Sequence, residues 1–141
     1  MEMCELKQEK EMLRAACKAR REEISPELKA ALDQKILALF LRSEFYQKAK
    51  GMLCYSAKLR EVETALLIDH ALAQRKRVAL PRCLDGEQMA FLEIRSRTEL
   101  VTSRFGLLEP REGLEPVSVE KYEICVVPGL AFDREGHRIG Y

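Results

Sequence analysis

The chain opens with two segments whose residues favour helices. Residues 5–24 are mainly strong helix formers and predict one long helix. A second helix is expected to start at Ser25, which suits the N-cap, with Pro26 in the first turn and Glu27 near the positive end of the dipole. Its apolar positions keep a helical period: Leu28, Leu32, Ile36, Leu39 and Phe40. This pattern predicts a helix that buries one face and ends near Ser43.

Short apolar runs follow, separated by a segment of helical pattern. Residues 52–55 and 77–81 have the length and composition of buried strands, and residues 61–74 between them predict a helix. A strand, a helix and a strand in succession predict a parallel pair with a right-handed crossover. A turn at 85–86 then leads to a third strand over 89–94, which can pair back as a hairpin.

The remaining third of the chain is less regular. Residues 96–100 predict a short helix, and the two Glu-Pro pairs in 105–116 favour extended loop. Residues 123–129 are nearly all apolar and predict a last strand, central in the sheet. These elements predict an α/β fold over 1–141: a single layered α/β/α (Rossmann-like) domain with a mostly parallel sheet and two N-terminal helices.

Composition narrows the function classes. The formal net charge of +1 gives no overall argument for nucleic acid or an anionic membrane as a partner. The five cysteines are scattered, with no CxxC pair, which argues against a disulfide framework or a zinc site and fits a reducing cytosol. The charged N-terminus is unlike a signal peptide, and no apolar run is long enough to cross a membrane. A cytoplasmic protein is expected.

Basic residues recur along the first predicted helix. A spacing of three or four positions places five of them on one face, here called the basic stripe: Lys7, Lys10, Arg14, Lys18 and Arg21. One interpretation is a solvated surface face, since acidic residues lie nearby. The other is a phosphate clamp, because lysine and arginine one turn apart can reach the same polyanion.

The segment 55–64 directly follows a predicted strand. In open α/β sheets, ligands bind at the carboxyl ends of strands, and this segment lies there. Tyr55 leaves the strand, and Glu61 and Glu63 are expected to open the next helix. Both acids are candidates for a ligand site, but both also suit the positive end of a helix dipole. Position alone does not choose between them.

The strand over 89–94 has two different faces. Met89 and Phe91 share one face because side chains alternate along a strand. They are candidates for the core, where both types are often buried, or for the wall of a pocket that takes a flat ring.

No catalytic or metal-binding residue stands out. His70 and His137 lie far apart in the chain, and there is no nucleophile elbow, Walker-type loop or complete GxGxxG. If the protein is an enzyme, its chemistry is expected to rest on substrate positioning and charge stabilisation.

Six segments together resemble the 5-formyltetrahydrofolate cyclo-ligase family, and they occur in the family's order: "KEMLR", "YSAKLREVET", "RVALPR", "MAFLEI", "FGLLEP" and "VPGLAFDREGHRIGY". The resemblance implies a reaction that depends on ATP and Mg²⁺ and converts 5-formyltetrahydrofolate to 5,10-methenyltetrahydrofolate, ADP and phosphate. In the reaction that the resemblance implies, the formyl oxygen would attack the γ-phosphate, and N10 of the folate would then close the ring. The substrate would supply the nucleophile, which fits a chain without one.

The resemblance also implies two groups of binding residues. ATP would be held through its phosphates by Lys10 and Arg14, and by a glycine-rich nucleotide loop that begins with Arg138, Gly140 and Tyr141.

The folate site is assigned to four residues by the same resemblance. Tyr55 and Glu61 would line it, with Glu61 hydrogen-bonded to the polar part of the substrate, and Met89 and Phe91 would pack on the ring system.

The family's loop continues as a glycine run and a Tyr-Tyr-Asp-like stretch, whereas this sequence ends at Tyr141. The domain is therefore expected to be truncated within the nucleotide loop and to lack C-terminal elements, leaving the strand at 123–127 less covered. The sequence is the ordered part of a longer chain, a truncated form or a naturally short relative, with the first two favoured. Weak or no cyclo-ligase activity is expected of these 141 residues.

Two other interpretations remain open. The chain can be a non-catalytic module that binds folate or nucleotide, or that merely dimerises through exposed apolar surface. A monomer or weak dimer is expected. It can also be another enzyme on a similar scaffold, such as a relative of sugar-phosphate isomerases or coenzyme A transferases. That alternative requires phosphate binding without ATP hydrolysis and a carboxylate base or nucleophile, for which Glu61 or Glu63 would serve.

Overall fold

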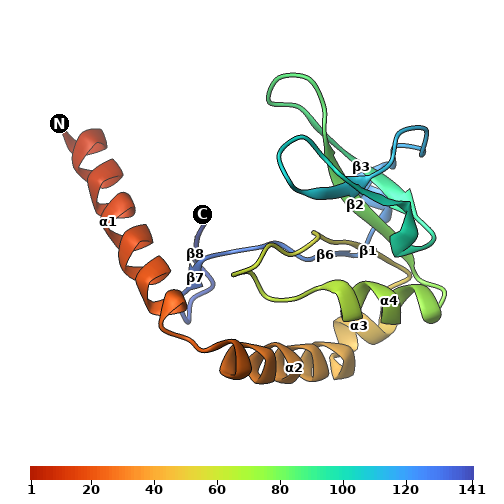
Figure 1. Cartoon of the computed structure of the whole chain (residues 1–141), viewed down its shortest axis with the longest axis horizontal. Coiled ribbons are helices and arrows are strands. Elements are labelled where there is room, and N and C mark those ends of the chain that lie inside the picture. Colours follow the sequence, from red (N-terminus) through yellow and green to blue (C-terminus); the bar gives the residue numbers. More distant parts are fainter.

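A computed structural model describes residues 1–141 (Figure 1). The α-helices are α1 (Glu2–Glu22), α2 (Pro26–Arg42), α3 (Glu44–Lys48) and α4 (Ala65–Ala73), with 3₁₀ turns η1 (Arg97–Glu99) and η2 (Val119–Lys121). The strands are β1 (Gly51–Leu53), β2 (Arg77–Cys83), β3 (Met89–Ile94), β4 (Leu100–Thr102), β5 (Leu108–Pro110), β6 (Ile124–Cys125), β7 (Ala131–Phe132) and β8 (Arg138–Ile139). The mixed α/β architecture agrees with the prediction.

The main sheet has the strand order β3-β2-β1-β6. Strand β1 is parallel to both β2 and β6, and α4 connects β1 to β2, so the predicted parallel pair with a helical crossover is confirmed. Strands β2 and β3 form the predicted antiparallel hairpin, from Val78 opposite Ile94 to Cys83 opposite Met89.

The two faces of the main sheet carry two apolar clusters. In the first cluster, Leu67, Ile68 and Ala71 of α4 pack against side chains of β1, β2 and β3 that include Met52 and Leu80. The second cluster lies on the other face and consists of Leu53, Ala79 and Tyr122, with Phe91 and Val117 packed against it. Burial of these side chains supplies the main driving force for folding.

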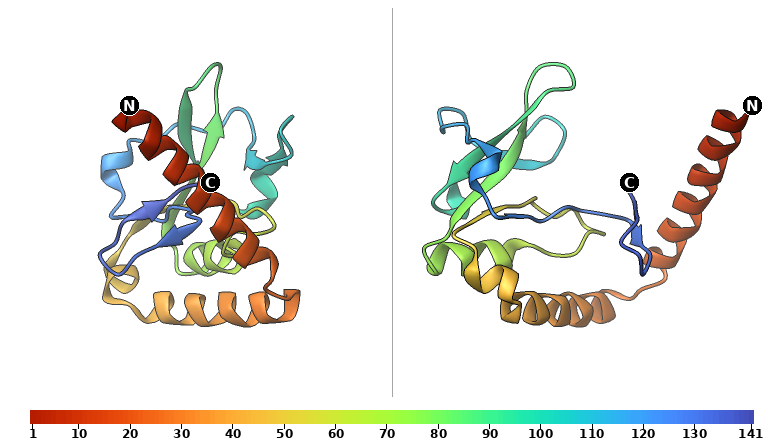
Figure 2. Two further views of the ribbon diagram at one scale, coloured as in Figure 1. Left: turned by 90° about the vertical axis from the view of Figure 1, so that its left-hand side faces the viewer. Right: turned by 180° about the vertical axis from the view of Figure 1, so that it is seen from behind.

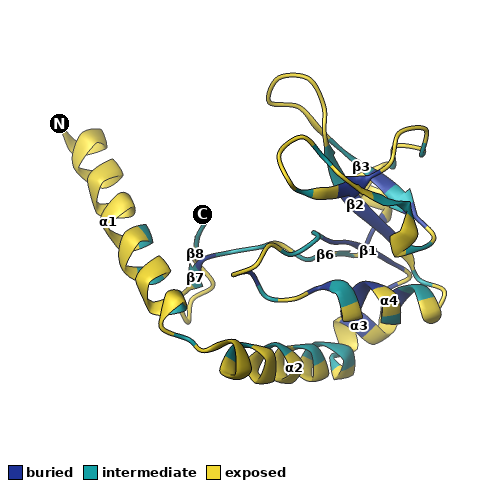
Figure 3. Ribbon diagram, viewed as in Figure 1, coloured by how far each residue is buried: buried dark blue, intermediate teal, exposed yellow.

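Helices α1 and α2 extend away from the sheet, and neither contains a buried residue (Figures 2 and 3). Ser25 caps α2 as predicted, because its hydroxyl accepts a hydrogen bond from Leu28 N. The prediction that α2 buries one face is wrong, since only its C-terminal turns reach the first cluster, through Leu37, Phe40 and Leu41. The remaining apolar positions are exposed by 38–65%: Leu28, Leu32, Ile36 and Leu39.

Three other expectations are corrected. Strand β6 pairs only with β1 and lies at the edge of the sheet, so the central position predicted from its apolar run is wrong. The segment 105–116 is not all loop, because β5 pairs with β4. Helix α4 begins at Ala65 rather than near Glu61, so both candidate acids lie in the β1–α4 loop, residues 54–64. The short strands β7 and β8 form a hairpin at the C-terminus.

Candidate functional site

Three segments that are distant in the sequence meet beside the C-terminal half of α1. They are α1 itself, the β1–α4 loop and the C-terminal segment, residues 129–141. The guanidinium group of Arg21 connects them. Its Nε donates to Leu130 O at 3.0 Å, its Nη2 to Gly129 O at 2.9 Å, and its Nη1 to Arg60 O and the Tyr141 hydroxyl, both at 2.8 Å. The basic stripe therefore faces the C-terminal segment at this end of the helix.

Other residues assigned to ATP lie along the same contact. Arg14 Nε donates to Gly140 O at 3.1 Å, which brings Arg14, Gly140 and Tyr141 into one neighbourhood. Lys10 lies one turn closer to the N-terminus of α1 and is exposed, and its side chain makes no hydrogen bond or ion pair. Arg138 is also exposed and donates to Pro128 O at 2.7 Å. The structure thus groups three of these five residues, and Lys10 and Arg138 lie outside that contact.

Glu61 is a buried carboxylate in the β1–α4 loop, with 8% of its surface exposed. A tight turn positions it: Glu61 N donates to Lys58 O at 3.0 Å, and Glu61 Oε2 accepts from Lys58 N at 2.8 Å. Its second oxygen has no hydrogen-bond partner among the protein groups. Glu61 lines a cavity of about 300 Å³ together with Arg21 and Tyr141. The free oxygen of this carboxylate can accept hydrogen bonds from a ligand that enters the cavity beside Arg21 and Tyr141.

Glu63 has a different role from Glu61. Its Oε1 accepts from Thr64 N and Ala65 N, both at 2.9 Å, at the start of α4. The interpretation that Glu63 serves the helix N-terminus is therefore confirmed, whereas Glu61 has no contact with the helix amides. This difference separates the two acids that the sequence left equivalent.

Tyr55 is half-buried at the end of β1, and its hydroxyl donates to Val62 O at 2.9 Å. Burial raises the pKa of Tyr55, and the nearby Cys54 and Glu61 raise it further. The pKa of Tyr141 is also raised by burial, with Arg21 acting in the opposite direction. Both phenols therefore remain protonated at neutral pH; the Tyr55 hydroxyl donates to Val62 O, whereas the Tyr141 hydroxyl accepts from Arg21.

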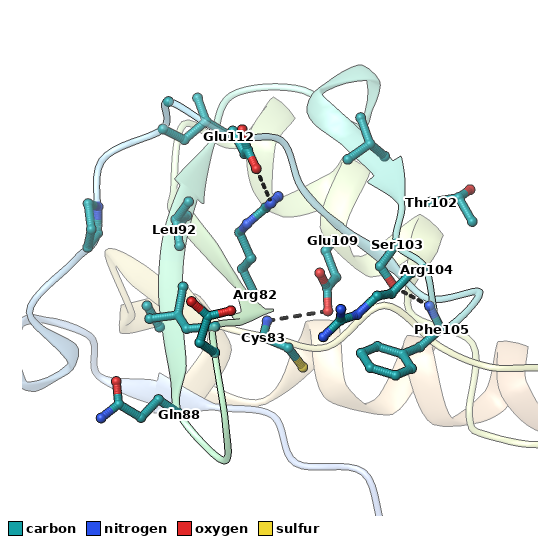
Figure 4. A pocket seen from close by; sticks show the side chains of 17 residues that line it. Arg82, Cys83, Gln88, Leu92, Thr102, Ser103, Arg104, Phe105, Glu109 and Glu112 are labelled. Atoms are coloured by element: carbon teal, nitrogen blue, oxygen red, sulfur yellow. Dashed lines mark hydrogen bonds and ion pairs between the residues drawn. The ribbon is translucent and has the colours of Figure 1, made fainter.

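A larger cavity of about 890 Å³ lies between the β2–β3 hairpin and the β4–β5 pair (Figure 4). Glu109, 6% exposed, accepts from Cys83 N at 3.3 Å inside it. Arg82 donates to Pro110 O at 2.6 Å and to Glu112 at 3.1 Å. Phe105 lies at the edge of this group in Figure 4. No pattern in the sequence indicates this cavity, because 105–116 has a loop pattern.

Met89 and Phe91 do not line either cavity. Ala90 and Leu92, on the opposite face of β3, line the larger cavity. Met89 is 56% exposed near the hairpin tip, and Phe91 packs against the second cluster. The packing of Phe91 agrees with the core interpretation, whereas the exposure of Met89 does not. The assignment of both residues to a substrate ring stays a prediction.

One group of metal-ligand types occurs in the β7–β8 hairpin. Ligand atoms of Asp133, Glu135 and His137 lie within 4.8 Å of one another, and all three residues are exposed. His137 N and Nδ1 contact the Asp133 carboxylate at 2.8 and 2.7 Å, and these hydrogen bonds hold the pKa of Asp133 below its usual range. The hydrogen bonds account for this arrangement without a metal ion. None of the helices combines the length and the apolar character that crossing a bilayer requires.

Comparison with known proteins supports the resemblance. The probable 5-formyltetrahydrofolate cyclo-ligase of Schizosaccharomyces pombe is 29% identical over 100 residues, covering 68% of this chain and 49% of the relative. The mitochondrial 5-formyltetrahydrofolate cyclo-ligase of Arabidopsis thaliana is 26% identical over 148 residues, covering 94% and 53%. The chain thus spans about half the length of these curated relatives.

The fold has a solved counterpart. The NMR structure of 5,10-methenyltetrahydrofolate synthetase from Aquifex aeolicus superposes with a TM-score of 0.82 at 30% identity, covering 94% of this chain and 66% of that one. The family model for 5-formyltetrahydrofolate cyclo-ligases matches residues 6–141. The chain therefore belongs to the 5-formyltetrahydrofolate cyclo-ligase family.

Proposed function

We propose that this chain forms the substrate-binding part of a 5-formyltetrahydrofolate cyclo-ligase that converts its substrate to 5,10-methenyltetrahydrofolate at the expense of ATP. The observation that carries the proposal is the buried Glu61, which keeps a free carboxylate oxygen beside Arg21 and Tyr141 in a chain of this family. A carboxylate in that position accepts hydrogen bonds from the N–H groups of a folate.

ATP is proposed to bind through its phosphates along the basic stripe. The exposed side chain of Lys10 makes no hydrogen bond or ion pair, and Arg14 lies next to the backbone of Gly140. Gly140 has space around its Cα, since a Cβ there would meet no atom within 4 Å, so a phosphate can approach its backbone closely. Mg²⁺ is proposed to arrive on the phosphates, because this ion keeps several waters and is usually held through substrate phosphates with one or two carboxylates.

The reaction requires no nucleophile from the protein. The formyl oxygen of the substrate attacks the γ-phosphate and ADP leaves; N10 then adds to the activated carbon, and phosphate leaves as the ring closes. Phosphoryl transfer of this kind is catalysed mainly by positioning and charge. Tyr55 and Glu61 are assigned to position the folate, and Met89 and Phe91 remain candidates for contact with its rings.

Separate measurements of binding and turnover test the proposal. Isothermal titration with 5-formyltetrahydrofolate is compared for the wild type, Glu61→Gln and Glu63→Gln, and formation of the methenyl product is followed by absorbance with MgATP. Glu61→Gln is expected to weaken folate binding by about tenfold or more, because a hydrogen bond to a charged acceptor is lost. Glu63→Gln keeps an oxygen acceptor for the α4 amides and is expected to bind normally.

The outcomes separate the candidate functions. Folate binding that depends on Glu61 without turnover supports the non-catalytic module, in line with the weak or absent activity expected of this chain. Turnover by the 141 residues themselves supports the enzyme and contradicts the requirement for the rest of the nucleotide loop. Absence of both folate and MgATP binding in the wild type overturns the proposal.

Three broader assignments belong to the same proposal. Residues 1–141 are taken as one domain, either monomeric or weakly dimeric, which light scattering measures. A cytoplasmic location is supported by five free cysteines. The name of the Arabidopsis relative places that protein in mitochondria, so fractionation of cells that express the protein decides this point.

A further inference from the structure

Arg21 has an unusual role among the basic residues of α1. Four of the five N–H groups of a guanidinium are used here, three of them on backbone carbonyls of two other segments and one on the Tyr141 hydroxyl. The guanidinium also lies 5.7 Å from the centre of the Tyr141 ring. Because its donors are occupied, Arg21 has little remaining capacity to bind a phosphate.

Helix α1 has few other connections to the rest of the protein. It contains no buried residue, so hydrophobic packing contributes little to its position. The remaining hydrogen bonds from α1 to distant segments are Arg14 Nε to Gly140 O at 3.1 Å and the bond that Arg21 O accepts from Arg60 Nη1 at 3.3 Å. Arg21 thus provides most of the directional contacts that place the helix.

We propose that Arg21 is a positioning residue, which holds the basic stripe of α1 against the C-terminal segment and the β1–α4 loop. The ATP phosphates and the folate are thereby placed next to each other. The inference rests on the proposed function and extends it, because it divides the stripe by role. Arg21 binds protein groups, whereas Lys10 and Arg14 are left to bind phosphate. Lysine is not an adequate substitute, since its single ammonium group cannot reproduce the planar fork that reaches carbonyls of both segments.

Four versions of the chain test the proposal: the wild type, Arg21→Ala, Arg21→Lys and Arg20→Ala. Arg20 is the matched control because it is the adjacent arginine, is exposed and makes no side-chain hydrogen bond. Two readouts are measured: hydrogen exchange of the amides in the C-terminal segment, including Leu130 N, which donates to Ile139 O, and the affinity for MgATP by titration. Exchange in the main sheet serves as the internal standard for global unfolding.

The expected result is faster exchange in the C-terminal segment and at least about tenfold weaker MgATP binding for both Arg21→Ala and Arg21→Lys. Sheet amides in all variants, and both readouts in Arg20→Ala, are expected to match the wild type. Normal MgATP affinity in Arg21→Lys would overturn the proposal in favour of simple charge attraction. Normal MgATP affinity in Arg21→Ala despite faster exchange would overturn the proposal and leave Arg21 with a purely structural role. Unchanged exchange in Arg21→Ala would show that Arg21 does not hold the C-terminal segment in place.

The two proposals fail in different ways. If the wild type binds neither MgATP nor 5-formyltetrahydrofolate, the proposed function is overturned, and so is the inference that Arg21 positions a phosphate site. Ligand binding in the wild type that Arg21→Ala leaves unchanged overturns the inference alone.

Discussion

The main sheet and the N-terminal arm, residues 2–42, are held in place by different interactions. In the sheet region Met52, Val78 and Leu80 have no exposed surface, and α4 packs directly on them. The arm has no buried residue and is joined to the other segments by hydrogen bonds of Arg14 and Arg21 and by the last turns of α2. The first region is stabilised by apolar burial, and the second is positioned by directional polar contacts.

This difference places the proposed site at the junction of the two regions. Glu61 belongs to a loop attached to the sheet, whereas Arg14 and Arg21 belong to the arm. Segments with few buried apolar contacts open locally at low cost, and ligand-binding elements are often of this kind. A ligand that contacts both sides gains affinity when the arm is already in position, because less conformational freedom is lost on binding.

The largest expected effect comes from equal truncations in the two regions. Leu80→Ala removes a fully buried side chain and is expected to reduce the free energy of unfolding by about 2–5 kcal/mol. Leu39→Ala removes a side chain of α2 that is 65% exposed. This substitution is expected to change the free energy of unfolding by about 0.5 kcal/mol or less. Urea unfolding followed by circular dichroism measures both. Similar losses for the two variants would show that the arm buries its apolar face in solution.

The sheet region was the part that the sequence predicted well, because its signals are local. Apolar runs of strand length, a helical period between 61 and 74 and a turn at 85–86 were sufficient for the parallel pair and the hairpin. The edge position of β6 was not predictable in this way. An apolar run indicates burial on both faces but does not say how many strands pair with it.

The contacts of the arm were not predictable for a different reason. Arg21 bonds to residues 108, 109 and 120 positions away, and the basic stripe alone gave no sign that one of its members binds carbonyl groups. The same limit applies to Glu61 and Glu63, which have the same side chain and lie two positions apart. Only the turn at Lys58 directs one inward, while the other reaches the helix amides.

The next largest effect is expected from two glycine substitutions, one in the main sheet and one in the C-terminal segment that contacts the arm. A Cβ on Gly51 in β1 would lie 2.9 Å from Cδ1 of the buried Tyr122 ring, so Gly51→Ala must displace that ring. The expected loss in unfolding free energy is about 1–3 kcal/mol. Gly140→Ala introduces no contact within 4 Å and is expected to leave stability unchanged. Thermal unfolding distinguishes them, and equal midpoints for the two variants would contradict close packing around Gly51.

The two regions are also expected to differ in their response to alkaline pH. Burial raises the pKa of Cys54 from 9.0 to about 12, so the folded state keeps the thiol protonated after the unfolded chain has lost its proton. This contribution to stability is complete below pH 9.0 and is lost as the pH rises towards 12. The slope is about 1.4 kcal/mol for each pH unit.

Urea unfolding at several alkaline pH values measures this effect. Cys54→Ala is expected to show a shallower fall in stability than the wild type, whereas alanine at the exposed Cys4 of α1 is expected to follow the wild type. Some slope remains in Cys54→Ala because the pKa of Tyr55 is also raised by burial. Parallel curves for the wild type and Cys54→Ala would show that the Cys54 thiol is accessible to solvent.

The smallest expected effect tests whether polar contacts matter equally in both regions. Arg97 pairs with Asp69 of α4 at 2.7 Å, but both side chains are more than 40% exposed. Asp69→Asn is expected to cost less than about 1 kcal/mol, because solvent screens such pairs.

The pH dependence of this pair has a defined sign. The hydrogen bond from Arg97 holds the pKa of Asp69 below 3.8, so its contribution is present above that pH and is lost as the pH falls through the folded-state value. The difference between the wild type and Asp69→Asn is therefore expected to shrink in acid and in about 1 M salt. A larger difference that persists in salt would show that the sheet region also depends on directional polar contacts, as the arm does through Arg21.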